Sequence, residues 1–522
     1  MAGRLQFSMG MGERLGRRTS PRIVNPSQNE RMTMIARAIA AAMASLLLAA
    51  APPPTVKVEG GVVRGAQDGG ASIFRGIPFA APPIGARRWT APAPVEPWRG
   101  VRDAAAPAAA CIQNDQGWNH ADFVSADEDC LPLDIRTPSL TGRRPVFVWI
   151  HGGSNRAGSP GDMVLSRFGK GEIVLVAIRY RLGIFGFLSH RALSAEAGSA
   201  SGNYGIMDQI AALDWVKRNI ARFGGDPDRV TIGGESAGAQ DVGLLLAAPA
   251  ARPLFAQAIM ESGTPGFGLP WRSREAGERI GDQADALLQT GGDVARLRAA
   301  SVPALLQADL RLHDEALEAD DYLWLRTTVD GRVFTRTPDV HLKEGPGKPL
   351  LIGSNRFELG LPGGRPHRDA FVARAFGDKE AKARAFYRLD QPDPTPDPRM
   401  GSRDDQIATD VTFRCPAGTM ASLMAAKGRP VWRYEFDLAP GGGRTSHSAE
   451  LAYIFGEQRL SQTLSLGDYW TRFVLNGDPN GEGLPAWPRY DVADRAHVTF
   501  DASGVVPGQR LREDVCRLSD RL

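Results

Sequence analysis

The sequence predicts an α/β protein with a mostly parallel central sheet, helices on both faces and a helical insertion over its active site. Two nearly unbroken apolar runs, 145–150 and 173–178, are typical of strands that are buried on both faces. Helical spacing of apolar residues follows at 205–223, and a further strand follows at 230–232. Strands of this kind alternating with helices indicate a parallel sheet that is covered on both sides.

The first 51 of the 522 residues differ from the rest of the chain. A basic stretch ending at Arg37 precedes an apolar, alanine-rich run at 38–51, which is typical of a secretory signal and too short for a membrane span of about 20 residues. The alternative is a buried helix. The segment has the usual layout of a signal peptide only if the chain starts at Met32 or Met34, so we expect translation to start at one of these residues. The remainder, 52–522, is predicted to be one domain, secreted or periplasmic.

Charge and cysteine content narrow the function. Residues 1–51 carry seven arginines and two glutamates, against a net charge of +3 for the whole chain, so the mature protein is nearly neutral. Neither a nucleic-acid-binding stripe nor stable membrane insertion after signal removal is expected, and no oligomeric state is indicated. The four cysteines lack Cys-x-x-Cys spacing and favour two disulfides, with three pairings possible. They are Cys111, Cys130, Cys415 and Cys516.

The other elements follow in order along the chain. Glycine separates two short alternating segments near the start of the domain, which predicts a hairpin. Charged helical sequence at 265–345 predicts the insertion, and 431–436 is the last strand assigned to the sheet. Residues 496–500 alternate as a strand on which His497 is expected to be structural. The expected segments are a hairpin at 55–58 and 61–64, strands at 145–150, 173–178, 230–232, 348–352 and 431–436, helix at 205–223, and helix then strand within 253–260.

Ser236 lies at the centre of a Gly-x-Ser-x-Gly pattern that directly follows a predicted strand. This pattern describes a sharp strand-to-helix turn that exposes a strained serine hydroxyl. Gly234 and Gly238 remove Cβ atoms where the chain must pass closely. The following helix directs free N–H groups towards a developing negative charge. Ser236 is therefore the candidate nucleophile.

A serine hydroxyl needs a base, a group that orients the base, and donors for an oxyanion. In this arrangement the acid and then the histidine follow the serine along the chain. His447, in a loop after the strand at 431–436, is the candidate base, and Glu358, after the strand at 348–352, is the candidate acid. The glycine-rich turn after 145–150 supplies candidate oxyanion donors together with Ala237; its residues are Gly152, Gly153 and Ser154.

Many ordered segments of the chain resemble the type-B carboxylesterase/cholinesterase family of α/β-hydrolases, from about residue 55 to the C-terminus. These segments are 74–89, 128–131, 151–153, 180–188, 202–209, 215–220, 223–227, 234–238, 447–451, 453–456, 477–480 and 487–488. The resemblance implies an α/β-hydrolase fold and a serine esterase acting on a small-molecule ester, without cofactor or metal.

The resemblance also implies roles for individual residues. Ser236 would be the nucleophile, His447 the base and Glu358 its orienting acid, with Gly153, Ser154 and Ala237 as the oxyanion donors and Gly152 shaping the turn. It further implies disulfides Cys111–Cys130 and Cys415–Cys516, an ion pair between Arg88 and Glu128, Ser262 as a partner of the acid, and an acyl pocket around Phe267 and Trp271.

The chain departs from the family at three places. Ser154 replaces the third glycine of the oxyanion loop, and Asn155 replaces a common aromatic residue. Phe357-Glu-Leu359 stands where Asp-Glu-Gly is usual, so a leucine takes a position that glycine's freedom normally serves. Alternatives to the esterase are a catalytically silent binding module, which the retained Ser236, Glu358 and His447 disfavour, and a hydrolase for a specialised ester, carbamate or lactone.

Overall fold

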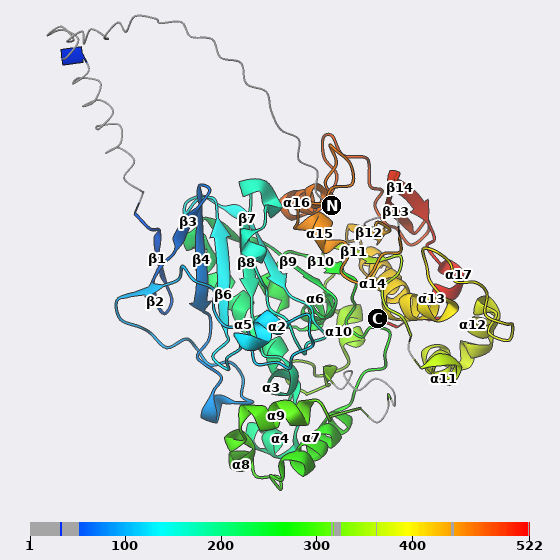
Figure 1. Cartoon of the computed structure of the whole chain (residues 1–522), viewed down its shortest axis with the longest axis horizontal. Coiled ribbons are helices and arrows are strands. Elements are labelled where there is room, and N and C mark those ends of the chain that lie inside the picture. The colour runs from blue at the N-terminus through cyan, green and yellow to red at the C-terminus, as the bar shows by residue number, and fades with distance from the viewer. Residues whose placement is uncertain are drawn as a thin grey trace, which may run out of the picture. The chain divides into compact units, whose positions relative to one another are not determined.

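The computed structural model describes residues 32–33, 52–314, 317, 325–361, 363–439, 443–519 and 521–522. The chain divides into two compact units, Met1–Pro52 and Pro53–Leu522. The expected signal segment lies almost wholly outside the described residues, so the signal and its cleavage stay predictions. In the second unit a long sheet is flanked by helices (Figure 1).

In the described part of the chain, the central sheet has eleven strands in the order β14-β13-β12-β11-β10-β9-β7-β8-β6-β4-β3. Neighbours from β8 to β13 are parallel, and the pairs at both edges are antiparallel. The mostly parallel sheet predicted from the sequence is confirmed. The strands are β3 (Ala66–Asp68), β4 (Ala71–Pro78), β6 (Pro132–Thr137), β7 (Arg144–Ile150), β8 (Val174–Ile178), β9 (Gly225–Glu235), β10 (Gln257–Glu261), β11 (Leu350–Asn355), β12 (Val431–Phe436), β13 (Ala496–Asp501) and β14 (Gly504–Gln509).

The sheet continues beyond the last strand that the sequence assigned to it. Strand β13 pairs in parallel with β12, with Tyr434 opposite Val498, and β14 closes the edge as an antiparallel hairpin. The expected alternation at 496–500 is present, but the polar face of β13 is buried as well as the apolar one. A strand buried on both faces belongs inside a covered sheet. His497 lies on this strand and is 5% exposed.

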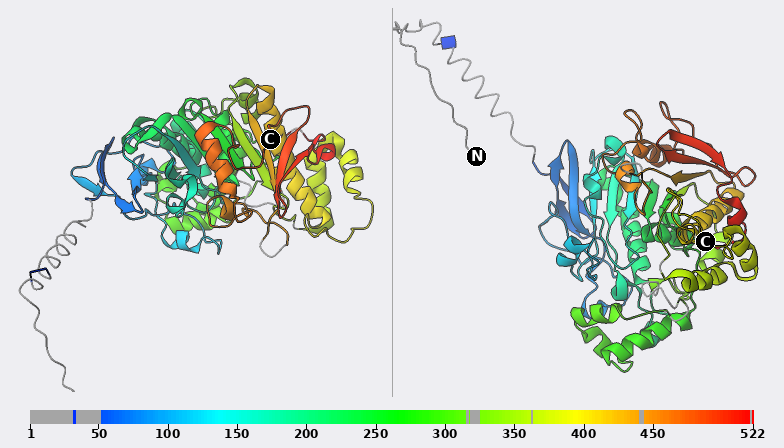
Figure 2. Two further views of the ribbon diagram at one scale, coloured as in Figure 1. Left: turned by 90° about the horizontal axis from the view of Figure 1, so that it is seen from above. Right: turned by 45° about the vertical axis from the view of Figure 1, so that its right-hand side comes forward.

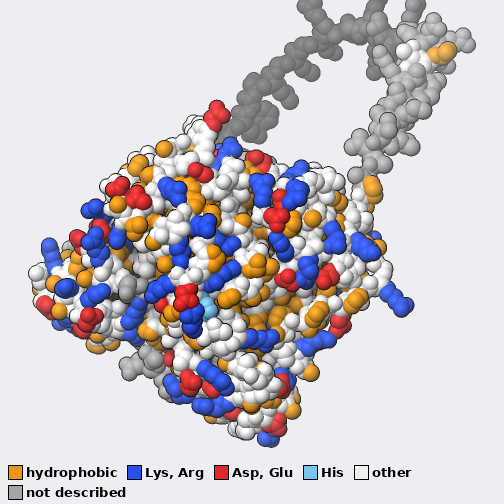
Figure 3. Space-filling model, turned by 180° about the vertical axis from the view of Figure 1, so that it is seen from behind, with side chains coloured by type: hydrophobic (Ala, Val, Ile, Leu, Met, Phe, Trp, Pro, Cys, Tyr) orange, Lys and Arg blue, Asp and Glu red, His pale blue; other side chains and the backbone are white. Residues whose placement is uncertain are grey.

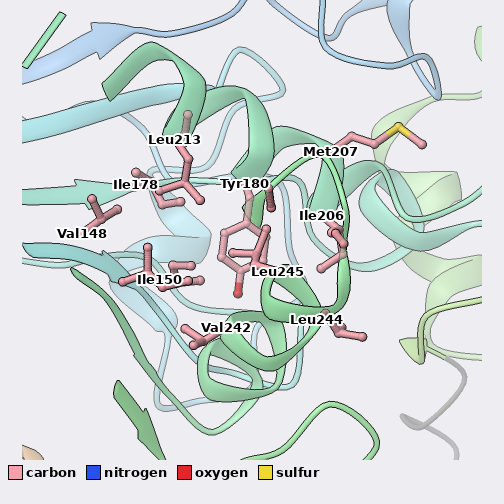
Figure 4. Close-up of a cluster of buried hydrophobic side chains, with 14 of the residues drawn as sticks. Val148, Ile150, Ile178, Tyr180, Ile206, Met207, Leu213, Val242, Leu244 and Leu245 are labelled. Atoms are coloured by element: carbon pink, nitrogen blue, oxygen red, sulfur yellow. The ribbon is translucent and has the colours of Figure 1, made fainter. Parts of the chain in front are cut away.

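Strand β7 shows how the core forms on both faces of the sheet. Successive side chains of a strand point to opposite faces. Val148 and Ile150 join the cluster that packs against helices α5 (Tyr204–Asn219) and α6 (Ala237–Ala247), whereas Phe147 and Trp149 join a second cluster with α16 (Leu466–Asn476). In Figure 4, Val148, Ile150 and Ile178 face the side chains of Leu213, Val242 and Leu245 on these two helices.

The helices fall into three groups along the chain. The first covers the sheet and includes α6, all of whose residues are buried, the polar Gln240 and Asp241 among them. The second, α7–α10, is the helical insertion expected at 265–345. The third, α11–α14, was not expected: α11–α13 lie beside β13–β14 (Figure 2), whereas α14 packs against β11 and β12. The helices are α2 (His120–Val124), α3 (Gly183–Phe187), α4 (Arg191–Ala197), α5 (Tyr204–Asn219), α6 (Ala237–Ala247), α7 (Arg274–Leu288), α8 (Val294–Ala299), α9 (Val302–Asp309), α10 (Pro338–Glu344), α11 (Gly364–Phe376), α12 (Glu380–Tyr387), α13 (Arg403–Thr409), the π-helix η9 (Asp410–Arg414), α14 (Cys415–Ala426), α15 (Leu451–Ile454), α16 (Leu466–Asn476) and α17 (Glu513–Cys516).

Smaller features implied by the sequence are also present. The expected hairpin is formed by β1 (Thr55–Val58) and β2 (Gly61–Arg64), which with β5 (Val101–Asp103) make a separate small sheet. Cys111 is joined to Cys130, and Cys415 is joined to Cys516. Arg88 makes a two-pronged ion pair with Glu128. These pairings agree with the family resemblance.

On the face drawn in Figure 3, basic and acidic side chains are interspersed, and neither sign of charge forms a large patch. Oppositely charged side chains also form ion pairs, such as Arg298 with Glu196 and Arg384 with Asp369. Among the described helices, none combines the length and apolar character that crossing a membrane requires.

The packing of α6 against β7 leads to a test of stability. Leu245 is fully buried between them, so Leu245→Ala leaves a cavity and is expected to lower the free energy of unfolding by about 2–5 kcal/mol. Leu310→Ala is the control, because Leu310 is 45% exposed. Urea denaturation of both variants measures the difference; equal losses would contradict this account of the core.

Candidate active site

The nucleophile elbow is built by β9, Ser236 and α6. Ser236 has φ 57° and ψ −125°, a conformation that an L-residue adopts only under constraint. The constraint is the lack of room around it: a Cβ atom on Gly238 would lie 2.1 Å from the carbonyl oxygen of Ile150, and one on Gly234 would lie 2.5 Å from the backbone of Gly238. Glycine at both positions therefore lets the turn close and presents the serine hydroxyl.

The structure brings Ser236, His447 and Glu358 together, although they come from distant parts of the chain. The Nε2 atom of His447 lies 2.8 Å from the Oγ of Ser236, and its Nδ1 lies 2.8 Å from an Oε2 of Glu358. Both distances are those of hydrogen bonds. The ring can therefore accept the serine proton on one side while the carboxylate fixes its tautomer on the other.

The loop that carries Glu358 is held by its own backbone and by the neighbouring π-helix. The backbone N–H of Asn355 donates to the Glu358 carboxylate at 2.7 Å, and the N–H of Glu358 donates to the Thr409 hydroxyl at 3.3 Å. Arg414 donates to the carbonyl oxygen of Arg356 at 2.6 Å. Leu359 does not adopt a positive φ, so the leucine in place of glycine causes no backbone strain.

The turn after β7 presents free backbone amides beside Ser236. Gly153 has φ 103° and Ser154 has φ 58°, and a Cβ atom on Gly153 would lie 2.0 Å from the carbonyl oxygen of Ala157. Within the described residues, the N–H groups of Gly153 and Ser154 have no protein acceptor. Ala237 is the first residue of α6, where N–H groups lack intrahelical partners. This arrangement can hold a negatively charged oxygen.

The departure at residue 155 of this turn fits the structure. Asn155 also has a positive φ, which asparagine tolerates better than most residues. Its side-chain amide donates to the carboxylate of Asp241 on α6 at 3.1 Å. Its backbone carbonyl oxygen accepts from the N–H of Gly183 at 2.8 Å. The polar residue at 155 thereby ties the turn to the helix that follows Ser236.

Two residues beside the histidine were not assigned a role from the sequence. Glu235 precedes the nucleophile, and its carboxylate lies 3.3 Å from the Nε2 of His447. The hydroxyl of Ser448 donates to this carboxylate at 2.6 Å. The only signal for Glu235 in the sequence was its place inside the Gly-x-Ser-x-Gly pattern, which does not reveal which way its side chain points.

Several carboxylates are buried around the histidine, and they shift its proton affinity. Burial alone lowers the pKa of His447, but the charges of Glu235 and Glu358 outweigh burial and raise the pKa to about 9. The pKa of Glu450 is raised to about 8 by burial and by the charges of Glu358 and Glu235. Ser262, which was expected to be a partner of the acid, donates to Glu450 at 2.9 Å. Asn355 donates to both Glu450 and Glu358, so Ser262 is linked to Glu358 only through Asn355.

A cavity of about 730 Å³ opens above Ser236. Its walls are mostly apolar, and they include Trp118 from the loop closed by the first disulfide. Phe267 lines the cavity as expected for an acyl pocket. Trp271 is not among the lining residues; it packs against the core of the fold. Phe413 of the π-helix packs between Phe267 and the His447 ring, with ring centres 5.6 and 5.2 Å apart.

Other ionisable groups lie outside this constellation. His497, the other late histidine, lies on β13, where burial is the main cause that lowers its pKa to about 4. Within the described residues, no group of three or more His, Cys, Asp or Glu side chains is placed to hold a metal ion.

Known proteins share this architecture over nearly the whole chain. The profile of the carboxylesterase family matches residues 52–518. The para-nitrobenzyl esterase of Bacillus subtilis is 33% identical over 86% of this chain and 94% of its own, and the fumonisin B1 esterase of Sphingopyxis macrogoltabida is 32% identical over 87% of each. A PNB esterase structure is 31% identical, with a TM-score of 0.76 over 89% of this chain and 99% of its own.

A carboxylesterase structure from Geobacillus stearothermophilus is also similar, at 31% identity and a TM-score of 0.70 over 88% of this chain and 99% of that one. Since the family profile spans the whole described body and these relatives are matched over most of their own length, the likeness is not limited to the elbow. The chain has the α/β-hydrolase fold, and it belongs to the carboxylesterase family of ester hydrolases.

Proposed function

We propose that this carboxylesterase cleaves carboxylic esters through an acyl-enzyme on Ser236. The observation that supports this most directly is the hydrogen-bonded series from Ser236 through His447 to Glu358. The serine oxygen attacks the ester carbon while His447 takes its proton. The tetrahedral oxyanion is held by the amides of Gly153, Ser154 and Ala237.

The first half ends when His447, now protonated, gives its proton to the leaving alcohol and the acyl-enzyme forms. The second half uses the same groups. A water molecule then enters, His447 takes a proton from it, and the hydroxide attacks the acyl carbon. The acid leaves and Ser236 regains its proton. Glu358 stabilises the imidazolium that exists in both halves.

The substrate class follows from the cavity rather than from the catalytic groups. Its largely apolar lining and its volume of about 730 Å³ suit a small-molecule ester with a sizeable apolar part. The relatives are named for different esters, a para-nitrobenzyl ester and a fumonisin. Because the walls of this cavity come from several loops, acyl and alcohol preferences are best measured with a matrix of acyl lengths and alcohol sizes.

We further propose that the leader is removed by a cut within a residue or two of Ala51 and that the mature enzyme acts outside the cytoplasm. The apolar run at 38–51, preceded by Arg37, supports a secretory signal. Two disulfides, which persist mainly in oxidising compartments, support the same location.

The nucleophile can be tested by covalent labelling. A fluorophosphonate probe is expected to react with Ser236, because the elbow exposes its hydroxyl next to a base. Peptide mapping of the labelled protein should place the adduct on Ser236, and Ser236→Ala should abolish it. Wild-type protein that stays unlabelled, or an adduct on another residue, would contradict the mechanism.

The acid can be tested with an isosteric change. Glu358→Gln keeps the size of the side chain but removes the charge that stabilises the imidazolium, so kcat is expected to fall about 10³- to 10⁴-fold. Steady-state kinetics on a para-nitrophenyl ester measure the loss, and Glu172→Gln, an exposed carboxylate, is the control. Turnover equal to wild type would remove Glu358 from the mechanism.

The pH dependence tests the role of Glu235. A nearby negative charge stabilises protonated His447, so kcat/KM of the wild type should rise through an apparent pKa above that of an ordinary histidine, towards 9. Glu235→Gln removes this charge, lowers the pKa of the base and should move the rising limb to lower pH by about 1–3 units. Profiles from pH 5 to 10 measure it, again with Glu172→Gln as control; a limb that stays in place or moves to higher pH would refute this role.

A further inference from the structure

A second cavity lies among C-terminal elements and shares no lining residue with the catalytic one. Its volume is about 280 Å³. Its walls come from strand β12, helices α14 and α17, and the segment that leads from β14 to α17. The Cys415–Cys516 disulfide forms part of the wall and joins α14 to α17. None of the proposed catalytic steps uses this region.

The cavity contains a buried arginine that lacks a carboxylate partner. Arg433 on β12 is 4% exposed, and its Nη2 donates to the carbonyl oxygen of Arg414 at 2.9 Å. Among the residues that the structure describes, no carboxylate lies within 4.0 Å of its guanidinium. Burial is the main cause that lowers its pKa, to about 10, so Arg433 remains charged at neutral pH. The charge of Glu435, two residues along β12, acts on Arg433, but this carboxylate is ion-paired with Arg356 and Arg414. A buried charge without a partner of its own is costly.

The fold makes room for this guanidinium instead of excluding it. Gly418 on α14 faces it, and a Cβ atom at that position would lie 3.1 Å from the Nη1 of Arg433. An alanine here would crowd the charged group. Hydroxyl groups are also available: Ser422 and Tyr490 line the same space and hydrogen-bond to each other at 2.6 Å.

The rim of the cavity adds further positive charge. The lining has four arginines against one glutamate, Glu513. This single carboxylate is already shared by the other three arginines: Arg495 lies 3.4 Å from it, Arg510 lies 3.6 Å from it, and Arg517 donates to it at 2.7 Å. Glu513 therefore cannot balance Arg433 as well, and the cavity keeps an excess of positive charge.

We propose that this cavity binds a small, multiply charged oxyanion of the phosphate or sulfate class. Guanidinium groups donate pairs of hydrogen bonds to the oxygens of such anions, and they do so most strongly where water is excluded. The volume is slightly below the roughly 300–1,000 Å³ of sites for larger organic ligands. The bound anion would give Arg433 the partner it lacks.

Binding there would join parts of the chain that are distant in sequence. An anion on Arg433 that also contacts Arg510 and Arg517 bridges the central sheet to the C-terminal segment. Because a ligand of the folded state stabilises it by mass action, resistance to unfolding should rise with anion concentration. This inference does not depend on the proposed catalytic mechanism, and labelling of Ser236 should be unaffected by it.

The test is a titration of the full-length protein with inorganic phosphate, sulfate and acetate at constant ionic strength maintained with sodium chloride. Isothermal calorimetry should show saturable binding of phosphate or sulfate near one per chain, and Tm should rise with their concentration more than with chloride or acetate. Preference for phosphate over sulfate, or the reverse, identifies the anion within the class. Acetate binding equally well, or no binding of either divalent anion, would overturn the proposal.

Variants locate the site. Arg433→Gln should raise the Kd at least tenfold, and Arg510→Gln, at the exposed rim, should raise it several-fold. Arg229→Gln removes an exposed arginine on β9 and is the control, with an unchanged Kd. Should Arg433→Gln fail to fold, Arg510→Gln decides the matter. The assignment is contradicted if Arg510→Gln binds the anion with wild-type affinity and Arg433→Gln either does the same or fails to fold.

Discussion

The close approach of three backbone segments around Ser236 is the constraint on which the site depends. The end of β7, the end of β9 and the start of α6 meet where no Cβ atom fits at residues 234 and 238. This contact fixes the strained serine, aims the first amide of α6 at the same point and places the turn after β7 beside it. The positions of the proposed nucleophile and of the proposed oxyanion donors therefore both follow from this packing, which the apolar faces of β7 and α6 stabilise.

Electrostatics add a second requirement, because the site concentrates negative charge in a buried place. Glu235, Glu358 and Glu450 surround one imidazole, and together they hold its proton more firmly than water would. The hydroxyl and amide groups of Ser448 and Asn355 satisfy these carboxylates. These carboxylates would stabilise the imidazolium that forms when the serine attacks. They would also raise the pH that is needed to deprotonate the histidine before it can act as a base.

Much of this could be predicted from the sequence, and the reasons differ between elements. The strand at 145–150 is apolar throughout, and the strand at 431–436 alternates aromatic with charged residues, so local pattern located both almost to the residue. Ser236 and its glycines form a local pattern, and the order along the chain selected His447 and Glu358. The relation of Glu235 to His447 and the packing of Trp271 depend on contacts between distant segments. No local pattern encodes such contacts, and the same holds for β13 and β14 as an extension of the sheet.

The π-helix at Asp410–Arg414 has a double task that links chemistry to selectivity. Through Arg414 it supports the loop of the catalytic acid, and through Phe413 it forms a wall of the cavity beside His447. One short segment thus supports the loop of the proposed acid and also lines the proposed substrate cavity. Adaptation of this wall to a new ester would disturb the support of the acid, so specificity and turnover in this enzyme are expected to evolve together rather than separately.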